Sequence, residues 1–139
     1  MTGVFFDTNV LLYLLSDDSR KADMAESLLR AGGHVSVQNL AELTAVCRRK
    51  FRMAWEDIAA VRQLVEAQCK VHGLTRAAHN RAFELAVATG YTIYDAQILA
   101  AAAAAGCHTV WSEDMHDGHD LSALGAPLAI RNPFAREPS

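Results

Sequence analysis

Short apolar segments alternate with longer helical segments along this chain of 139 residues. This alternation predicts an α/β sandwich with a mainly parallel central sheet, because each strand is followed by a helix before the next strand begins. Strands are predicted at residues 4–6, 34–37, 71–74, 107–111 and 128–130.

The segments between these strands carry apolar side chains at helical spacing. Thr8 or Asn9 can cap the first helix and Ser19 the second, while Gly90 and Gly106 fall where later helices should end. Helices are predicted from residue 8 or 9 to about 15 and over about 19–30, 39–52, 56–70, 76–89 and 92–105, with a polar loop at 112–121.

Length and composition indicate one globular domain, with 51% hydrophobic and 21% charged residues. We expect the domain to cover residues 1–132 and a tail to cover 133–139. The formal net charge of −3 does not suggest a nucleic-acid-binding protein as a whole. A local basic surface is still compatible with that total, because an acidic site lowers it.

Three cysteines, at positions 47, 69 and 107, form no close-spaced pair. This argues against a disulfide framework and against a zinc site with cysteine ligands. The sequence begins without a basic leader, and its alanine-rich run at 100–105 is too short to span a bilayer. We therefore expect a cytoplasmic protein with reduced, buried cysteines and no membrane association.

Four acidic residues stand where apolar segments give way to turns or helix starts: Asp7, Glu42, Asp95 and Asp114. In parallel sheets, sites form beyond the carboxyl ends of the strands, so the fold can gather these acids at one edge. Clustered carboxylates repel one another unless a cation holds them. The set therefore points to a hard divalent metal and to phosphate chemistry.

Each acid also has a purely structural interpretation. Asp7 can cap the first helix; Asn39 with Glu42, and Thr92 with Asp95, have the spacing of capping boxes. Asp114 lies in a polar loop, where exposure to solvent alone would explain an acidic residue.

Four segments together carry a family resemblance. FFDTNVL at residues 5–11 resembles the opening of a PIN-domain nuclease, and TIYDAQILAAA at 92–102 resembles the third acidic motif of that family. WSEDM at 111–115 resembles its fourth motif, and NPF at 132–134 looks like the ending of many bacterial members. The segment around Glu42 is less distinctive. The compact length looks like the VapC toxin of VapBC toxin–antitoxin pairs.

The resemblance implies a PIN fold and the hydrolysis of RNA to a 5′-phosphate and a 3′-hydroxyl. It also implies a homodimer and an antitoxin whose C-terminal arm covers the groove near the active site. On this interpretation Asp7 and Asp95 are the principal ligands of Mg²⁺ or Mn²⁺, and Glu42 and Asp114 bind directly or through water. Thr8, Asn9 and Ser112 are expected to support them. The family pattern has no acid at Asp117, whose role stays open.

Basic residues cluster near the end of the helix that carries Glu42: Arg48, Arg49, Lys50 and Arg52. They can bind RNA phosphates, or they can compensate the helix dipole and face solvent.

Two rival functions stay open. One is a PIN-like RNA-binding module without catalytic activity. The other is a small phosphatase with Asp7 as nucleophile, although haloacid-dehalogenase phosphatases need a second aspartate where this chain has Asn9.

Overall fold

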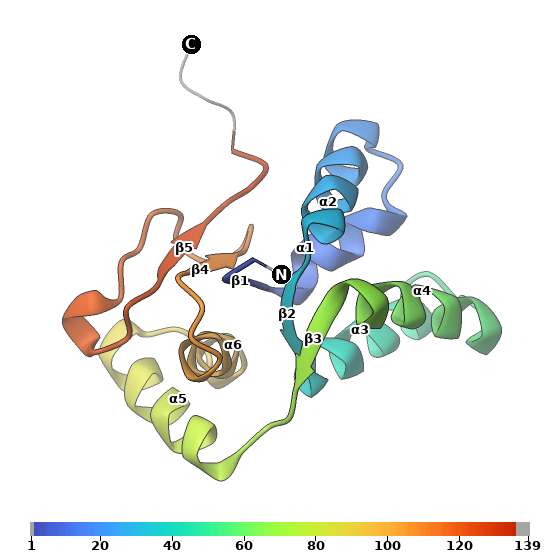
Figure 1. Cartoon of the computed structure of the whole chain (residues 1–139). Coiled ribbons are helices and arrows are strands. Elements are labelled where there is room, and N and C mark those ends of the chain that lie inside the picture. Colours follow the sequence, from blue (N-terminus) through green and yellow to red (C-terminus); the bar gives the residue numbers. More distant parts are fainter. Residues whose placement is uncertain (1, 136–139) are drawn as a thin grey trace.

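The computed structural model describes residues 2–135. At its centre lies a five-stranded sheet in the order β3-β2-β1-β4-β5, and all neighbouring strands are parallel. Helices cover both faces of the sheet (Figure 1), so the predicted α/β sandwich is confirmed. The strands are β1 (Val4–Phe6), β2 (Gly33–Ser36), β3 (Cys69–His72), β4 (Thr109–Trp111) and β5 (Ala129–Arg131).

The helices divide between the two faces, with α1 to α4 on one side and α5 and α6 on the other (Figure 1). The first group comprises α1 (Thr8–Leu12), the short 3₁₀ helix η1 (Tyr13–Leu15), α2 (Ser19–Ala31), α3 (Val37–Arg49) and α4 (Trp55–Gln68). The second comprises α5 (Arg76–Thr89) and α6 (Ile93–Ala104); a further 3₁₀ helix, η2 (Ser122–Leu124), precedes β5.

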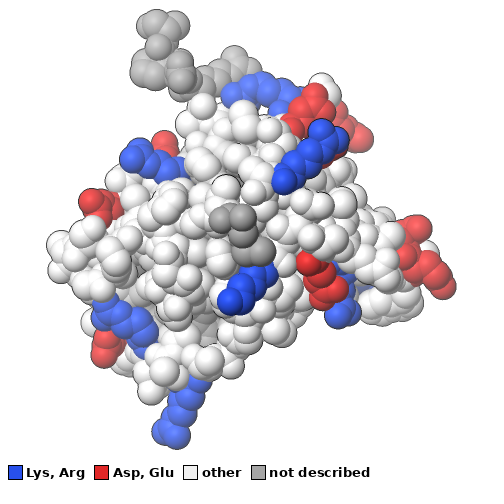
Figure 2. Space-filling view, in the orientation of Figure 1, with Lys and Arg blue, Asp and Glu red and all other residues white. Residues whose placement is uncertain are grey.

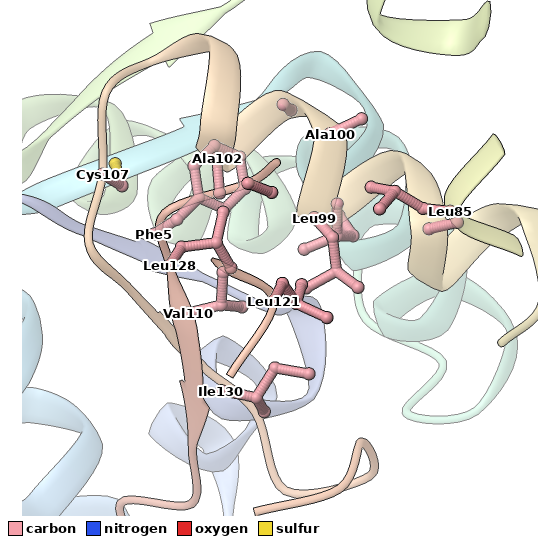
Figure 3. Packing of buried hydrophobic residues seen from close by; sticks show 14 of the residues in the cluster. Phe5, Leu85, Leu99, Ala100, Ala102, Cys107, Val110, Leu121, Leu128 and Ile130 are labelled. Carbon is pink, nitrogen blue, oxygen red and sulfur yellow. The ribbon is translucent and has the colours of Figure 1, made fainter. Parts of the chain in front are cut away.

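Two neighbouring phenylalanines in β1 show how the sheet separates two cores. Phe5 packs with Leu99 and other buried residues of α5, α6, β4 and β5 (Figure 3), whereas Phe6 packs with residues of α1 to α4. Both rings are fully buried, as the alternation of side chains along a strand requires. Burying a side chain of this size stabilises the fold by about 1.5–3 kcal/mol, so β1 is anchored firmly from both faces.

Helix starts differ from the predictions at three positions. Asp7, not Thr8 or Asn9, is the N-cap of α1, and its side chain accepts a hydrogen bond from the Thr8 amide. Asp18, not Ser19, caps α2 by accepting a hydrogen bond from the Lys21 amide. Ser36 caps α3 and forms a capping box with Asn39, so the predicted pairing of Asn39 with Glu42 is wrong. Since β2 passes directly into α3, the cap falls three residues earlier and the Glu42 side chain is not used in it.

The first strand marks the point where the connections reverse direction across the sheet. β2 and β3 follow on one side of β1, while β4 and β5 lie on the other. The Asp7 amide donates to the Trp111 carbonyl at 2.9 Å, so the β1–β4 pairing continues past the end of β1. In open parallel sheets, ligands bind at such a reversal, beyond the carboxyl ends of the strands.

The predicted tail contains a packed residue at its second position. Phe134 is buried among the α1 to α4 side chains, with its ring 4.7 Å from that of Tyr13. Residues 136–139 lie outside the described part of the chain, and the boundary at 132 stays a prediction. Across residues 2–135, none of the helices combines the length and the apolar character needed to cross a bilayer.

Candidate active site

Asp7 lies at the reversal point of the sheet and is held by three donors. Its Oδ1 accepts a hydrogen bond from the Thr8 amide at 2.7 Å. Its Oδ2 accepts from the Ser112 hydroxyl at 2.8 Å and from the Asn9 side-chain amide at 3.1 Å. The side chain is therefore fixed by the start of α1 on one side and by the end of β4 on the other. The supporting roles of Thr8, Asn9 and Ser112 stay predictions, but all three contact this carboxylate.

The pKa of Asp7 is raised from 3.8 to about 6, chiefly because burial penalises the charged carboxylate. The negative charges of Asp95 and Glu42 raise it further, against the lowering effect of the Ser112 and Thr8 hydrogen bonds. Burial also raises the pKa of Asp95, and the charge of Asp114 adds to that shift. The four predicted acids are therefore linked as electrostatic neighbours, and they leave excess negative charge at the sheet edge.

The acids are near one another without forming a ligand sphere. Within residues 2–135, no three His, Cys, Asp or Glu side chains are placed closely enough to hold one ion together. Asp7 is buried, Glu42 and Asp95 are half-buried, and Asp114 is exposed in the loop after β4. Repulsion among like charges favours such spacing.

Glu42 is oriented by neighbours from α1 and from its own helix. Its Oε1 accepts hydrogen bonds from the Thr8 hydroxyl at 3.1 Å and from the Gln38 side-chain amide at 3.3 Å. The Asn39 amide in turn donates to the Thr8 hydroxyl and to the Phe6 carbonyl, each at 3.0 Å. Because Thr8 contacts both acids, one residue links the positions of Asp7 and Glu42.

A line of hydrogen bonds reaches Glu42 from the opposite face of the sheet. His79 of α5 lies 2.7 Å from Oε1 of Gln97 in α6, measured from its Nδ1. The Gln97 amide donates to Oε1 of Gln38 at 2.8 Å, and the Gln38 amide donates to Glu42 and to the Tyr94 carbonyl. A carbonyl oxygen only accepts, so Nδ1 of His79 carries a proton and every donor in the line points towards Glu42.

The backbone amide of Asp95 takes part in the cap of α6. The Thr92 hydroxyl accepts the Asp95 backbone amide at 3.1 Å and thereby caps α6. The carboxylate is left at the first turn of the helix, where the positive end of the helix dipole favours a negative charge. The helix dipole and the Thr92 side chain, which lowers the pKa of Asp95 against the effect of burial, therefore also favour an acid at this position.

Asp117 has a local partner. Its Oδ1 accepts a hydrogen bond from the Asn132 amide at 2.8 Å, which ties the loop after β4 to the end of β5. This contact gives Asp117 a structural role that does not involve the acidic site.

The basic residues lie at the C-terminus of α3 and in the turn that follows, and all four are exposed. The Arg48 guanidinium lies over the Trp55 ring, 4.9 Å from its centroid. Lys50 lines a pocket of about 430 Å³ together with Asn9 and Asp114. The cluster therefore extends to the edge of the acidic site through Lys50.

Comparison with known proteins now identifies the family. The family model of the PIN domain matches residues 4–116, a range that includes all four acids. The chain belongs to the PIN domain family. No curated protein matches the sequence at a significant level.

Solved structures support the same PIN fold. The chain is similar to VapC20 of Mycobacterium tuberculosis, described as a Sarcin-Ricin loop cleaving toxin, with a TM-score of 0.66 and 20% identity over 91% of this chain and 98% of the other. A toxin–antitoxin complex from Klebsiella pneumoniae gives a TM-score of 0.66 and 18% identity over 94% and 98% of the two chains. FitAcB from Neisseria gonorrhoeae gives 0.63 and 19% over 94% and 98%.

Sequence patterns alone missed several residues of this PIN domain site. Gln38 and Asn39 are buried polar residues beside Glu42, and their position in an otherwise apolar segment was the available signal. Glu113 was also missed: its backbone amide donates to Oδ1 of Asn9 at 3.1 Å, and its side chain pairs with Lys21 at 2.7 Å. Nothing in the sequence spacing connects Lys21 of α2 with residue 113.

Proposed function

We propose that this PIN domain is a divalent-metal-dependent endoribonuclease and the toxin of a type II toxin–antitoxin pair. The observation that carries the proposal is the buried Asp7 carboxylate, whose pKa is raised to about 6 with Asp95 and Glu42 as charged neighbours. A cation at this edge of the sheet would relieve the repulsion and return these groups to their charged forms.

The donor set suits Mg²⁺ or Mn²⁺. Every candidate ligand is an oxygen, which hard cations prefer, and the site offers no cysteine. Asp7 and Asp95 would hold the metal, and Glu42 and Asp114 would bind directly or through water. When bound, such a cation lowers the pKa of a water ligand and offsets charge on the phosphodiester.

The chain's own residues would hold the acidic side chains of this site in position. Ser112 and Asn9 fix one oxygen of Asp7, and the Thr8 amide fixes the other. Thr8 and Gln38 hold one oxygen of Glu42, so its second oxygen is available to orient an attacking water. Positioning of this kind reduces the barrier by limiting the motion of the reacting groups.

The proposed partners rest on the family and on the similar structures. VapC20 is described as cleaving the sarcin–ricin loop, which supports RNA as the substrate class here. Two further similar structures are a toxin–antitoxin complex and VapBC2 of Rickettsia felis bound to promoter DNA. We accordingly propose a cognate antitoxin and a homodimer for this chain.

Cleavage of a structured RNA by purified protein tests the proposal. We expect cleavage with Mg²⁺ or Mn²⁺, none with EDTA, and a loss of orders of magnitude for Asp7→Asn or Asp95→Asn, because each change removes a charged ligand. Full activity of Asp95→Asn in a nuclease-free preparation would contradict the site. RNA binding without any cleavage would favour the inactive RNA-binding module instead.

The phosphatase alternative has its own test. Asn9 donates its amide to Asp7, where a phosphatase of that type needs a second acid. A trapped phosphoaspartate at Asp7 would establish the phosphatase, and we expect none.

A further inference from the structure

The turn between α3 and α4, together with the last residues of α3 and the first residue of α4, exposes two aromatic side chains; this segment, residues 48–55, is called the turn below. Trp55 is 58% exposed and Phe51 is 42% exposed, although rings of this size contribute most to stability when they are buried. Each ring is paired with a cation: Arg48 lies 4.9 Å from the Trp55 centroid, and Lys50 lies 5.7 Å from the Phe51 centroid. The turn thus presents alternating basic and aromatic groups to solvent.

Hydrogen bonds within the turn hold this surface in place. The Met53 amide donates to the Cys47 carbonyl at 3.1 Å, and the Arg48 guanidinium donates to the Met53 carbonyl at 3.0 Å. Met53 itself packs against the core beneath α1 to α4. The exposed rings therefore extend from a backbone that is anchored beneath them.

The same surface is continuous with the acidic site. Phe51 and Lys50 line the 430 Å³ pocket whose other walls include Asn9 and Asp114. A chain bound near Asp114 would therefore meet Lys50 and Phe51, and Trp55 follows four residues farther along the sequence, beside Arg48. Glu56 and Asp57 follow at the start of α4, so the positive charge is concentrated on the α3 side of this path.

We propose that Phe51 and Trp55 form a stacking platform for unpaired bases of RNA next to the cleavage site, with Arg48 and Lys50 beside the phosphates. This inference rests on the proposed nuclease function and specifies single-stranded nucleotides as what this part of the site binds. Aromatic faces bind splayed bases, whereas bases inside a duplex are already covered by their neighbours. Stacking is tolerant of sequence, so the platform selects for unpaired structure and not for one base.

A polyanion fits this turn better than a peptide does. Four cations stand within residues 48–52, and phosphates at regular spacing can neutralise several of them at once. An acidic peptide would match the charges but offers no flat partner for two separate rings, so it is the competing outcome of the test.

Binding measured without cleavage provides that test. A fluorescently labelled, unstructured oligoribonucleotide is titrated with protein in EDTA, and anisotropy gives the affinity. We expect Trp55→Ala and Phe51→Ala each to weaken binding about tenfold, as removal of one stacked base contact does, while Trp55→Phe and Phe51→Tyr stay close to wild type. The affinity for an RNA duplex should be the same for all these variants.

An exposed aromatic residue elsewhere serves as the control. Phe83 of α5 is 63% exposed and lies outside the turn, so Phe83→Ala should leave the affinity for the oligoribonucleotide unchanged. Thermal melts of every variant establish that it is folded. Unchanged affinity of the Trp55 and Phe51 alanine variants would overturn the platform, as would a polyglutamate peptide that binds this turn in preference to RNA.

The platform and the nuclease function can fail separately. If the Trp55 and Phe51 alanine variants cleave RNA with Mn²⁺ and also bind the oligoribonucleotide as the wild type does, the platform alone is refuted. Ring-dependent binding in EDTA by a protein that never cleaves RNA would refute the nuclease function and leave the platform standing.

Discussion

Asp7 serves two purposes at once, because it stands at the start of α1 and within a group of like charges. Its hydrogen bonds favour the ionised carboxylate, yet its pKa is raised to about 6 since burial and neighbouring acids outweigh them. A residue kept only as a helix cap would be expected at the surface, where ionisation is less costly. Because the effects that raise the pKa of Asp7 outweigh those that lower it, this pKa should respond strongly when a cation binds.

The first prediction concerns pH and metal together. A carboxyl whose pKa is higher in the folded protein than in the unfolded chain contributes stability below the unfolded value of 3.8, and that contribution is lost as pH rises through about 6. For Asp7 the loss approaches about 3 kcal/mol at neutral pH. Mn²⁺ should offset this loss, so its effect on the melting temperature should be small at pH 5 and large at pH 7. Calorimetric scans with Mn²⁺ or EDTA at both values measure the difference, and equal shifts would contradict it.

Asp95 provides a second prediction, in which loss of function accompanies a gain in stability. Asp95→Asn removes repulsion from Asp7 and Asp114 but keeps the backbone amide that Thr92 caps. In EDTA at neutral pH we expect the variant to be more stable by up to about 1 kcal/mol, a modest figure because the group is half-exposed.

A matched control separates repulsion from the helix dipole. Glu56 also lies in the first turn of a helix but is exposed and belongs to α4. Glu56→Gln should leave stability unchanged or lower it slightly, since it loses only a favourable dipole interaction. If Asp95→Asn melts clearly lower than wild type, the capping interpretation of Asp95 is correct and the repulsion argument fails.

At the scale of elements, α3, α5 and α6 are joined by the line of hydrogen bonds from His79 through Gln97 and Gln38 to Glu42. Gln97 and Gln38 are the middle residues of this line. Each side-chain amide accepts a hydrogen bond on one side and donates one on the other, so only one orientation of the amide satisfies both neighbours. The line passes from the helices on one face of the sheet to α3 on the other. It therefore connects the placement of Glu42 to the packing of α5 on α6.

The third prediction follows from this line. Gln97→Leu leaves Oε1 of Gln38 without its donor and releases the Gln38 amide from a fixed orientation. We expect cleavage to slow several-fold through kcat, in line with about 1 kcal/mol for a hydrogen bond, with KM almost unchanged. Gln97→Glu tests the direction of the bonds: it removes the donor to Gln38 and should not restore the rate.

Gln63 of α4 offers the control for that substitution. It is exposed and belongs to α4, which contributes no residue to the line, so Gln63→Leu should cleave RNA at the wild-type rate. A Gln97→Leu enzyme with unchanged kcat, measured beside it, would show that the line does not position Glu42.

Element order and sheet class were predictable because they depend on periodicity within short windows. The order of the strands and the start of α3 were harder. Ser36 and Asn39 form their capping box only once β2 ends at Ser36, and the sequence alone equally allowed Asn39 to begin the helix. The contacts of Gln38 with Gln97, and of Glu113 with Lys21, join residues from different elements. No local pattern encodes such pairs, so the acids could be singled out from the sequence but their supporting residues only in part.

The net charge of the whole molecule does not favour binding of the proposed substrate. The chain carries a net charge of −3, yet its proposed substrate is a polyanion. On the face seen in Figure 2, basic and acidic side chains are interspersed and do not form one extended basic surface. RNA binding must therefore depend on a local concentration of cations, and the turn after α3 supplies one beside the acidic site.

The last prediction measures that local contribution. Arg49→Ala combined with Arg52→Asn removes two exposed cations; asparagine is chosen at position 52 because Arg52 has a φ of 53°, which asparagine tolerates better than most residues. Each phosphate contact on single-stranded RNA contributes about 0.7 to the slope of log affinity against log salt. The double variant should therefore bind an unstructured oligoribonucleotide in EDTA with a slope lower by about 1.4, and its Mn²⁺ affinity should stay close to wild type.

The matched control removes a cation from the neighbouring helix. Arg62 of α4 is exposed and pairs with Glu66 at 3.3 Å, so Arg62→Ala alters the overall charge of the protein without touching the turn. If charge as a whole governed binding, Arg62→Ala would flatten the salt dependence about half as much as the double variant does. If the turn governs it, Arg62→Ala keeps the wild-type slope. An unchanged slope for the double variant would instead mean that Arg49 and Arg52 are solvated residues at the end of α3 and that RNA meets the acidic site from another direction.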